Sequence, residues 1–297
     1  MKRILIPRPN LFSFDECLWF LNRNYDDCLH VIEPGKIHKA ICINGQNIAF
    51  TLQADERHLL LHLGDQQLSP QQEQALERYI SDWFDLDRDI TPFYKLLAKH
   101  KQLAYMATDY AGFRLIGIHD LFEALCWSII GQQINLTFAY ILKRRLVEQY
   151  GTPISFNDHT LHIFPAPEVL QSVSMEALRA LQFSTRKAEY LLSIASLFAA
   201  GTLSKERLQQ CSSYNEQVAQ LTAVRGIGVW TANYAIMKSL KQLQAIPMGD
   251  VGLLNALTNH QLIKDRQDHT RIDKLFKQFK GWESYLVFYL WRSLSHA

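Results

Sequence analysis

This 297-residue chain contains two features whose residue types and spacing suit a chemical role. They are a short glycine-rich turn and a single aspartate. The turn, Gly226-Ile227-Gly228, joins two segments with helical patterns, so residues 213–243 predict a helical hairpin. Glycine relieves the Cβ clash that blocks unusual dihedral angles and the close approach of another backbone. The N-terminus of the second helix directs unpaired N–H groups and a partial positive charge at one point. A phosphate fits there without a lysine.

The aspartate, Asp250, lies beyond the hairpin, where residues 247–249 predict a loop and residues 251–258 predict a helix. Aspartate favours the position that caps a helix N-terminus, and Asp250 taken alone is more simply explained as a cap. The two roles are compatible, since a helix N-terminus favours the charged carboxylate. A fixed anion can stabilise the positive charge that builds on a sugar when an N-glycosidic bond breaks, and can also orient or deprotonate a water.

The residues on both sides of the turn make a pattern that is more specific than the two glycines. Gly-x-Gly between helices also occurs without any ligand. Here the pattern continues as Leu221-x-x-Val224-x-Gly226-Ile227-Gly228-x-x-Thr231-Ala232, followed by Asn233-Tyr234. It resembles the hairpin of the helix–hairpin–helix DNA glycosylases, and most closely that of their alkylbase branch, 3-methyladenine DNA glycosylase II.

The resemblance extends over almost the whole chain. It includes the N-terminal part and three further segments: Ile129-Ile130-Gly131-Gln132-Gln133-Ile134, Arg186-Lys187-Ala188-Glu189-Tyr190, and Trp282-Glu283-Ser284-Tyr285 through Trp291. One departure is Arg225, where the family usually has proline. Arginine makes the turn less rigid, but it adds a cation beside the expected phosphate.

The resemblance implies a catalytic role for Asp250. The family's catalytic aspartate lies as far beyond its hairpin as Asp250 lies beyond Gly228, and it begins the next helix. Family members with lyase activity carry a lysine two residues after the second hairpin glycine, where this chain has Trp230. We therefore expect a monofunctional enzyme that forms no Schiff base there. Purines alkylated at N3 or N7 already carry positive charge and leave without general-acid help, so one carboxylate can suffice.

Four aromatic residues correspond, by the resemblance, to positions in or near a pocket for the excised base: Phe20, Trp230, Tyr234 and Trp291. Trp291 is the best supported, because the segment that ends there matches in both sequence and spacing. A cationic base is attracted to electron-rich rings by ~0.5–2 kcal/mol. Core packing is the alternative explanation for aromatic residues on apolar helix faces.

A base inside a duplex must be flipped out, and the gap it leaves must be filled. The resemblance places Gln132 and Gln133 at this gap, in a loop between two helices. A glutamine there could hydrogen-bond the widowed partner base. Which of the two is the wedge stays open, and termination of a helix is the simpler explanation without the family match.

The hairpin residues are expected to bind a DNA phosphate and, by the resemblance alone, a monovalent cation. The expected phosphate-binding residues are Arg225, Gly226, Gly228, Val229 and Thr231. A structural K⁺ or Na⁺ would lie among the backbone carbonyls of Thr222, Val224 and Ile227. The chemistry itself needs no cofactor, and no iron–sulfur cluster is expected, because no cysteine follows Cys211.

The elements around these residues predict an α+β fold in two parts. Residues 39–43 and 48–52 read as strands joined by a tight turn at Asn44-Gly45, residues 57–63 as another strand, and residues 69–84 as a helix. We place this small N-terminal α+β domain at residues 1–104. The pattern from residue 105 to residue 297 is helical throughout, and it predicts a mainly α-helical glycosylase core that contains the hairpin.

The composition is compatible with this chemistry but does not prove it. Hydrophobic residues make up 48% of the chain, and the net charge is only +2, which neither demands nor opposes a nucleic-acid partner. The chain shows no signal peptide and no apolar run long enough to span a bilayer. We expect a cytoplasmic monomer whose partner is double-stranded DNA with damaged bases.

Two other functions stay open. One is a bifunctional glycosylase/lyase for oxidised bases, against which Trp230 counts. The other is a non-catalytic DNA-binding module that uses only the hairpin, against which Asp250 and the aromatic set count. A metal-dependent nuclease would need clustered Asp, Glu or His ligands, and the sequence predicts no such cluster.

Overall fold

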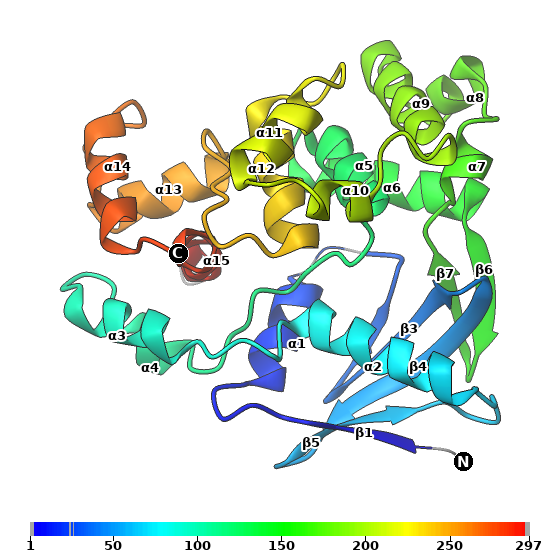
Figure 1. Ribbon diagram of the computed structural model, residues 1–297, viewed down its shortest axis with the longest axis horizontal. Coiled ribbons are helices and arrows are strands. Elements are labelled where there is room, and N and C mark those ends of the chain that lie inside the picture. Colours follow the sequence, from blue (N-terminus) through cyan, green and yellow to red (C-terminus); the bar gives the residue numbers. More distant parts are fainter. Residues whose placement is uncertain (1–2, 24, 26, 295–297) are drawn as a thin grey trace.

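An antiparallel sheet of five strands forms the N-terminal part of the protein (Figure 1). The computed structural model describes residues 3–23, 25 and 27–294. The strand order is β1-β5-β4-β3-β2, with bounds β1 (Arg3–Pro7), β2 (Val31–Glu33), β3 (Lys36–Ile43), β4 (Gln46–Ala54) and β5 (His58–His62). Asn44 and Gly45 both have positive φ angles and pair Ile43 with Gln46 across the turn, which confirms the predicted hairpin.

Two helices of the N-terminal part pack beside this sheet, α1 (Phe14–Asn22) and α2 (Pro70–Phe84). Ser69 caps α2 in a capping box with Gln72, as expected for the predicted helix. Two further helices, α3 (Thr91–Lys99) and α4 (Met106–Asp109), lead to the helical core. The tyrosine hydroxyls of Tyr94 in α3 and Tyr289 lie 2.7 Å apart and join α3 to the last helix.

The helical core places α5 (Leu121–Gly131) against the second helix of the hairpin. Asp120 caps α5, and Asn135 caps α6 (Leu136–Tyr150), which ends with Gly151 as its C-cap. The other helices are α7 (Pro167–Leu170), α8 (Met175–Ala180), α9 (Thr185–Ala199), α10 (Lys205–Gln209), α11 (Tyr214–Thr222), α12 (Val229–Ala235), α13 (Val251–Asn259), α14 (His269–Gln278) and α15 (Glu283–Ser293). None of the described helices is both long and apolar enough to cross a membrane.

The second hairpin helix is shorter than predicted. The α-helical part ends at Ala235 and continues as one π-helical segment, η1 (Ile236–Leu240), rather than as an α-helix to residue 243. Lys241 has a φ of 56°, a left-handed conformation that stops the helix. The buried amine of Lys241 donates to the backbone carbonyl of Leu115, and this tertiary contact stabilises the end of the helix.

A second, two-stranded sheet interrupts the helices, so the prediction of helices throughout residues 105–297 is wrong at this point. It consists of β6 (Thr152–Phe156) and β7 (His159–Ile163), joined by a turn in which Asn157 has a positive φ. This hairpin packs against β3, with the buried Leu161 touching Ala40 and Ala49. It also brings His159 beside Glu33 and His38, so the prediction of no clustered Asp, Glu or His ligands is also wrong.

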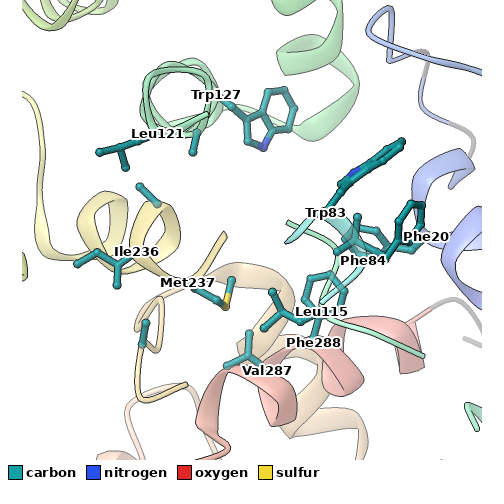
Figure 2. Close-up of a cluster of buried hydrophobic side chains, with 14 of the residues drawn as sticks. Phe20, Trp83, Phe84, Leu115, Leu121, Trp127, Ile236, Met237, Val287 and Phe288 are labelled. Atoms are coloured by element: carbon teal, nitrogen blue, oxygen red, sulfur yellow. The ribbon is translucent and has the colours of Figure 1, made fainter. Parts of the chain in front are cut away.

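The N-terminal part and the helical core share one hydrophobic core. Figure 2 shows Phe20 of α1 and Trp83 and Phe84 of α2 beside Phe288 of α15, with Trp127 of α5 and Met237 of η1 close by. The boundary at residues 104/105 stays a prediction. Because the core is continuous, the N-terminal part forms one wall of the space between α1, α5, η1 and α15.

Candidate active site

The hairpin turn between α11 and α12 requires glycine at its first position. Gly226 has a φ of +93°, and a Cβ on it would lie 2.3 Å from Cγ of Tyr190. Gly228 is different, because its φ is −84° and a Cβ would meet nothing within 4 Å. Of the two turn glycines, only Gly226 is therefore required by the conformation and packing of the protein. The open space in front of Gly228 is room for another molecule.

The exposed end of α12 carries the groups expected to face a phosphate. Gly228 and Val229 are exposed, and so is the guanidinium of Arg225, which pairs with Glu189 at 3.1 Å. Thr231 is buried, and its hydroxyl accepts a hydrogen bond from Gln132. The side chain of Thr231 is therefore already engaged within the protein and does not face a phosphate.

The loop after α5 is attached to the hairpin through one of its two glutamines. The side-chain amide of Gln132 donates to the carbonyl of Gly226 at 3.1 Å and to the hydroxyl of Thr231 at 3.0 Å. Gln133 has a φ of 57° and an exposed side chain. Gln132 is thus held by the protein, while Gln133 is the glutamine that projects from the loop.

Asp250 caps α13, and one of its oxygens receives two hydrogen bonds. Oδ1 accepts from the backbone N–H of Leu253 at 2.7 Å and from the indole Nε1 of Trp291 at 2.8 Å. No residue in the described part of the chain bonds to the other oxygen, Oδ2. The capping bond and the indole fix the carboxylate and leave one oxygen for a substrate or a water.

A glycine next to this carboxylate makes room for the aspartate–tryptophan pair. A Cβ on Gly252 would lie 3.1 Å from Oδ1 of Asp250 and 3.4 Å from the indole of Trp291. A larger residue would require the carboxylate to shift by a few tenths of an ångström. The first turn of α13 is therefore shaped around the contact between Asp250 and Trp291.

The predicted pocket aromatics lie in one connected row, in which Trp291 has a ring neighbour on either side. The ring centroids of Trp230 and Tyr234 are 5.7 Å apart, and those of Tyr234 and Trp291 are 6.2 Å apart. Phe288 continues the row, 5.8 Å from Trp291 and 4.4 Å from Phe20. Trp230, Tyr234 and Trp291 are half-buried, whereas Phe20 is buried. The first three rings form an accessible surface beside Asp250, and Phe20 lies deeper.

A cavity of about 80 Å³ lies behind this surface, and Tyr234 and Phe20 belong to its lining. Asp250 and Trp291 do not line it, but Tyr234 connects it to Trp291 directly, and Phe20 connects it to Trp291 through Phe288. Trp127 also lines the cavity, and its indole Nε1 donates to the hydroxyl of Tyr234 at 3.0 Å. We place the candidate active site at Asp250, where the fixed carboxylate meets the accessible aromatic surface, and take the cavity as its inner extension.

The inner cavity is charged as well as aromatic. The ammonium of Lys143 lies 2.9 Å from both oxygens of Asp27. Burial by itself would raise the pKa of the Asp27 carboxyl, but the charge of Lys143 lowers it below its usual range. Lys238 lies over the rings of Phe20 and Phe288, and burial lowers the pKa of its amine well below the usual value. The cavity thus holds a salt bridge and a lysine whose charged form is disfavoured.

The sequence matches two family models that together cover most of the chain. The HhH-GPD superfamily base excision DNA repair protein matches residues 126–281, and the 8-oxoguanine DNA glycosylase, N-terminal domain, matches residues 32–125. The chain belongs to the HhH-GPD superfamily of base excision DNA repair proteins. It is a DNA glycosylase of the helix–hairpin–helix type, which confirms the family expected from the hairpin.

The relatives of this HhH-GPD protein include enzymes named for 3-methyladenine. The DNA-3-methyladenine glycosylase of Bacillus subtilis is 36% identical over 98% of this chain and 97% of its own length. DNA-3-methyladenine glycosylase 2 of Escherichia coli is 28% identical over 61% of this chain and 60% of its own length. A solved 3-methyladenine DNA-glycosylase from Archaeoglobus fulgidus has a TM-score of 0.84 at 23% identity, covering 98% of this chain and 97% of that one. This last similarity shows the shared fold.

Three further residues around the candidate site of this HhH-GPD protein were not predicted. Phe288 is one of many apolar residues in α15, and nothing in the sequence marks it. Trp127 lies on a helix that is apolar all round and is equally unmarked. Gly252 did carry a signal, because a glycine in the first turn of a helix is unfavourable unless close packing needs it.

Proposed function

We propose that this protein is a monofunctional DNA glycosylase that excises alkylated purines, of the 3-methyladenine and 7-methylguanine type, from double-stranded DNA. The observation that carries the proposal is the pair formed by Asp250 and Trp291, which joins a fixed carboxylate to the edge of an aromatic surface. The name and near-complete coverage of the Bacillus subtilis relative support the same substrate class. We further propose that the protein acts as a monomer on DNA in the cytoplasm.

Asp250 would act on the sugar. Cleavage of the N-glycosidic bond develops positive charge at the sugar carbon, and the oxygen Oδ2 is the free end of the carboxylate. A fixed anion there stabilises the oxocarbenium-like transition state and can also activate the attacking water. Because Oδ1 is already bonded to Leu253 and Trp291, the carboxylate needs little reorganisation when the charge appears.

The aromatic surface would receive the flipped base. Trp230, Tyr234 and Trp291 offer electron-rich rings beside Asp250, and a cationic purine is attracted to them by ~0.5–2 kcal/mol. Phe20, which packs against Phe288, would form the deeper wall of the pocket for the base. The leaving base carries its own positive charge, so no general acid is needed.

The hairpin and the loop after α5 would hold the DNA. The N–H groups at Gly228 and Val229, assisted by Arg225, would receive a backbone phosphate. Gln133, which projects from its loop, would fill the gap left by the flipped base, while Gln132 keeps that loop attached to the hairpin.

The hairpin fits a monovalent cation in its donor chemistry. Backbone carbonyl oxygens are ligands that K⁺ and Na⁺ accept, and the turn contains those of Thr222, Val224 and Ile227. The carbonyl of Val224 accepts one hydrogen bond, from the N–H of Ile227 at 3.0 Å, and keeps a second lone pair. A bound cation would add positive charge opposite the phosphate and would take no part in the bond cleavage.

A glycosylase/lyase for oxidised bases is the second candidate, and the match of residues 32–125 to the 8-oxoguanine DNA glycosylase N-terminal domain favours it. Against it, Trp230 occupies the position at which lyase members carry their lysine. Lys238 lines the inner cavity, but its amine donates to the carbonyl of Ile116 and is not at that position.

The test is an assay of the purified protein on methylated duplex DNA and on a panel of single-lesion duplexes, including 8-oxoguanine, without added divalent metal. The proposal predicts release of free 7-methylguanine or 3-methyladenine and intact strands that carry abasic sites. Borohydride trapping of a covalent protein–DNA adduct would instead support the lyase. Binding without any base release would support the non-catalytic module and overturn the proposal.

A further inference from the structure

A cluster of one glutamate and two histidines lies where the β6–β7 hairpin packs on the N-terminal sheet. Glu33 ends β2, His38 lies in β3 and His159 begins β7. One ligand atom from each residue lies within 4.8 Å of the other two. Figure 1 shows β3 and β7 side by side, with α13 of the candidate active site on the opposite side of the molecule.

The distances in this cluster match those between ligands of one metal ion, although His159 is also within hydrogen-bonding distance of Glu33. Nε2 of His38 is 3.5 Å from Oε2 of Glu33, and Nε2 of His159 is 3.1 Å from Oε1. Ligands at 2.0–2.1 Å from a tetrahedral zinc ion are separated from one another by about 3.3 Å. Two imidazoles and one carboxylate are a common ligand set for zinc, with a water in the fourth position.

The second observation is the orphaned nitrogen of His38. The residue is only 3% exposed, and its buried Nε2 has no hydrogen-bond partner. Leaving a buried polar atom unpaired costs about 1–3 kcal/mol. The other ring nitrogen, Nδ1, lies 2.9 Å from the hydroxyl of Thr51. When Nδ1 carries the proton and donates to Thr51, the lone pair of Nε2 points into the cluster, as in metal-binding histidines.

The place of the cluster gives the ion a structural role. The hairpin rests on β3 and β4 through a small apolar cluster of its own, whose buried members are Ala40, Ala49 and Leu161. Two alanines bury little apolar surface, so this contact gains less from the hydrophobic effect than the main core does. A metal bond between His159 and the sheet would add to it directly.

We propose that Glu33, His38 and His159 bind one zinc ion that clamps the β6–β7 hairpin onto the N-terminal sheet. Lys36 competes with the ion, because its ammonium lies 2.5 Å from Oε2 of Glu33. Its side chain is 35% exposed, so it can swing away when zinc binds. The proposal is independent of the proposed glycosylase reaction.

The test uses the untagged full-length protein after dialysis against a chelator, titrated with zinc chloride in a calorimeter and heated with and without zinc. The wild type is expected to bind one zinc ion and to gain several degrees in Tm. His159→Gln should bind zinc at least about tenfold more weakly, and the Tm gain should disappear. His162→Gln, on the same strand but outside the cluster, should behave like the wild type. His159 is chosen because a variant of the buried His38 could fail to fold.

Two further measurements make the outcome unambiguous. Lys36→Met should bind zinc several-fold more tightly than the wild type, since a competing cation has been removed. Cobalt in place of zinc should give the intense visible absorption of a four-coordinate ion in the wild type and not in His159→Gln. Equal zinc binding by the wild type and His159→Gln, or no effect of zinc on the wild-type Tm, would show that the cluster is only an ion pair and would overturn the proposal.

Discussion

The indole Nε1 of Trp291 donates a hydrogen bond of 2.8 Å to Oδ1 of Asp250, across 41 residues of sequence. The contact links the N-terminus of α13 to α15 and lies beside the aromatic row. In the proposed mechanism one side chain serves two purposes: its ring would face the base, and its N–H orients the carboxylate proposed as catalytic.

Trp291→Phe separates these two purposes, because it keeps a ring and removes the N–H. A hydrogen bond to a charged group contributes about 1.5–3 kcal/mol, so the rate constant of base release is expected to fall by about 10- to 100-fold. Single-turnover release of 7-methylguanine measures it. Trp282→Phe is the matched control, since Trp282 packs against Phe93 and Tyr285 and has no bond to Asp250. Equal losses in both variants would refute a specific role for the indole.

The two hairpin glycines should respond differently to alanine. In Gly226→Ala the new methyl group meets Tyr190 at a positive φ, so the free energy of unfolding should drop by more than about 2 kcal/mol. In Gly228→Ala the methyl group has free space, so stability should change by less than about 1 kcal/mol while the Kd for DNA rises. Denaturant unfolding and a DNA-binding titration on both variants check this. Unchanged DNA binding by Gly228→Ala would argue against a phosphate at that end of α12.

Gln133→Ala tests the proposed wedge. Its side chain is exposed, so the substitution should leave stability unchanged. Base excision should fall by about tenfold, because nothing then fills the gap left by the flipped base. Gln132→Ala should instead lower stability, since it breaks the bonds to Gly226 and Thr231. A fluorescent base analogue placed next to the lesion reports flipping. The same flipping signal in Gln133→Ala and in the wild type would exclude this residue as the wedge.

Acid should destabilise the protein through His30, which lines the inner cavity. Burial lowers the pKa of His30 from 6.5 to about 4, although the neighbouring Asp27 opposes this. The folded state binds this proton less readily than the unfolded state, so the stabilising contribution is complete above pH 6.5 and is lost as the pH falls to about 4. The loss is at most about 3 kcal/mol. Unfolding titrations between pH 7 and pH 4 should show a shallower decline in His30→Gln, and parallel curves would contradict the assignment.

Local signals accounted for the predictions that the structure confirmed. Asn44-Gly45 specifies its own turn, and Ser69 specifies the helix end that it caps, because the determining contacts lie within a few residues. Asp250 was predicted as a cap on the same grounds. The β6–β7 hairpin was missed because Ile154, Phe156 and Leu161 give only a short alternating pattern, and its strands are stabilised by packing on β3.

The relationships within the site depend on contacts between distant segments, which no local pattern encodes. The bond from Gln132 to Gly226 distinguishes two adjacent glutamines that look equivalent in the sequence. Phe288, which connects Phe20 to Trp291, lies on a helix whose residues are nearly all buried, so periodicity could not single it out. The residue types were predictable from the family resemblance, but their pairings required the fold.

The most direct test of the account is the rate of 7-methylguanine release by Asp250→Asn. An asparagine oxygen can still accept from Leu253 and Trp291, so the fold and the Kd for DNA should be retained while the negative charge is lost. Asp268→Asn is the control, because Asp268 caps α14 in the same way and lies outside the site. The account predicts that Asp250→Asn releases base at least about 100-fold more slowly than the wild type and that Asp268→Asn matches the wild type. A wild-type rate in Asp250→Asn would contradict the proposed mechanism.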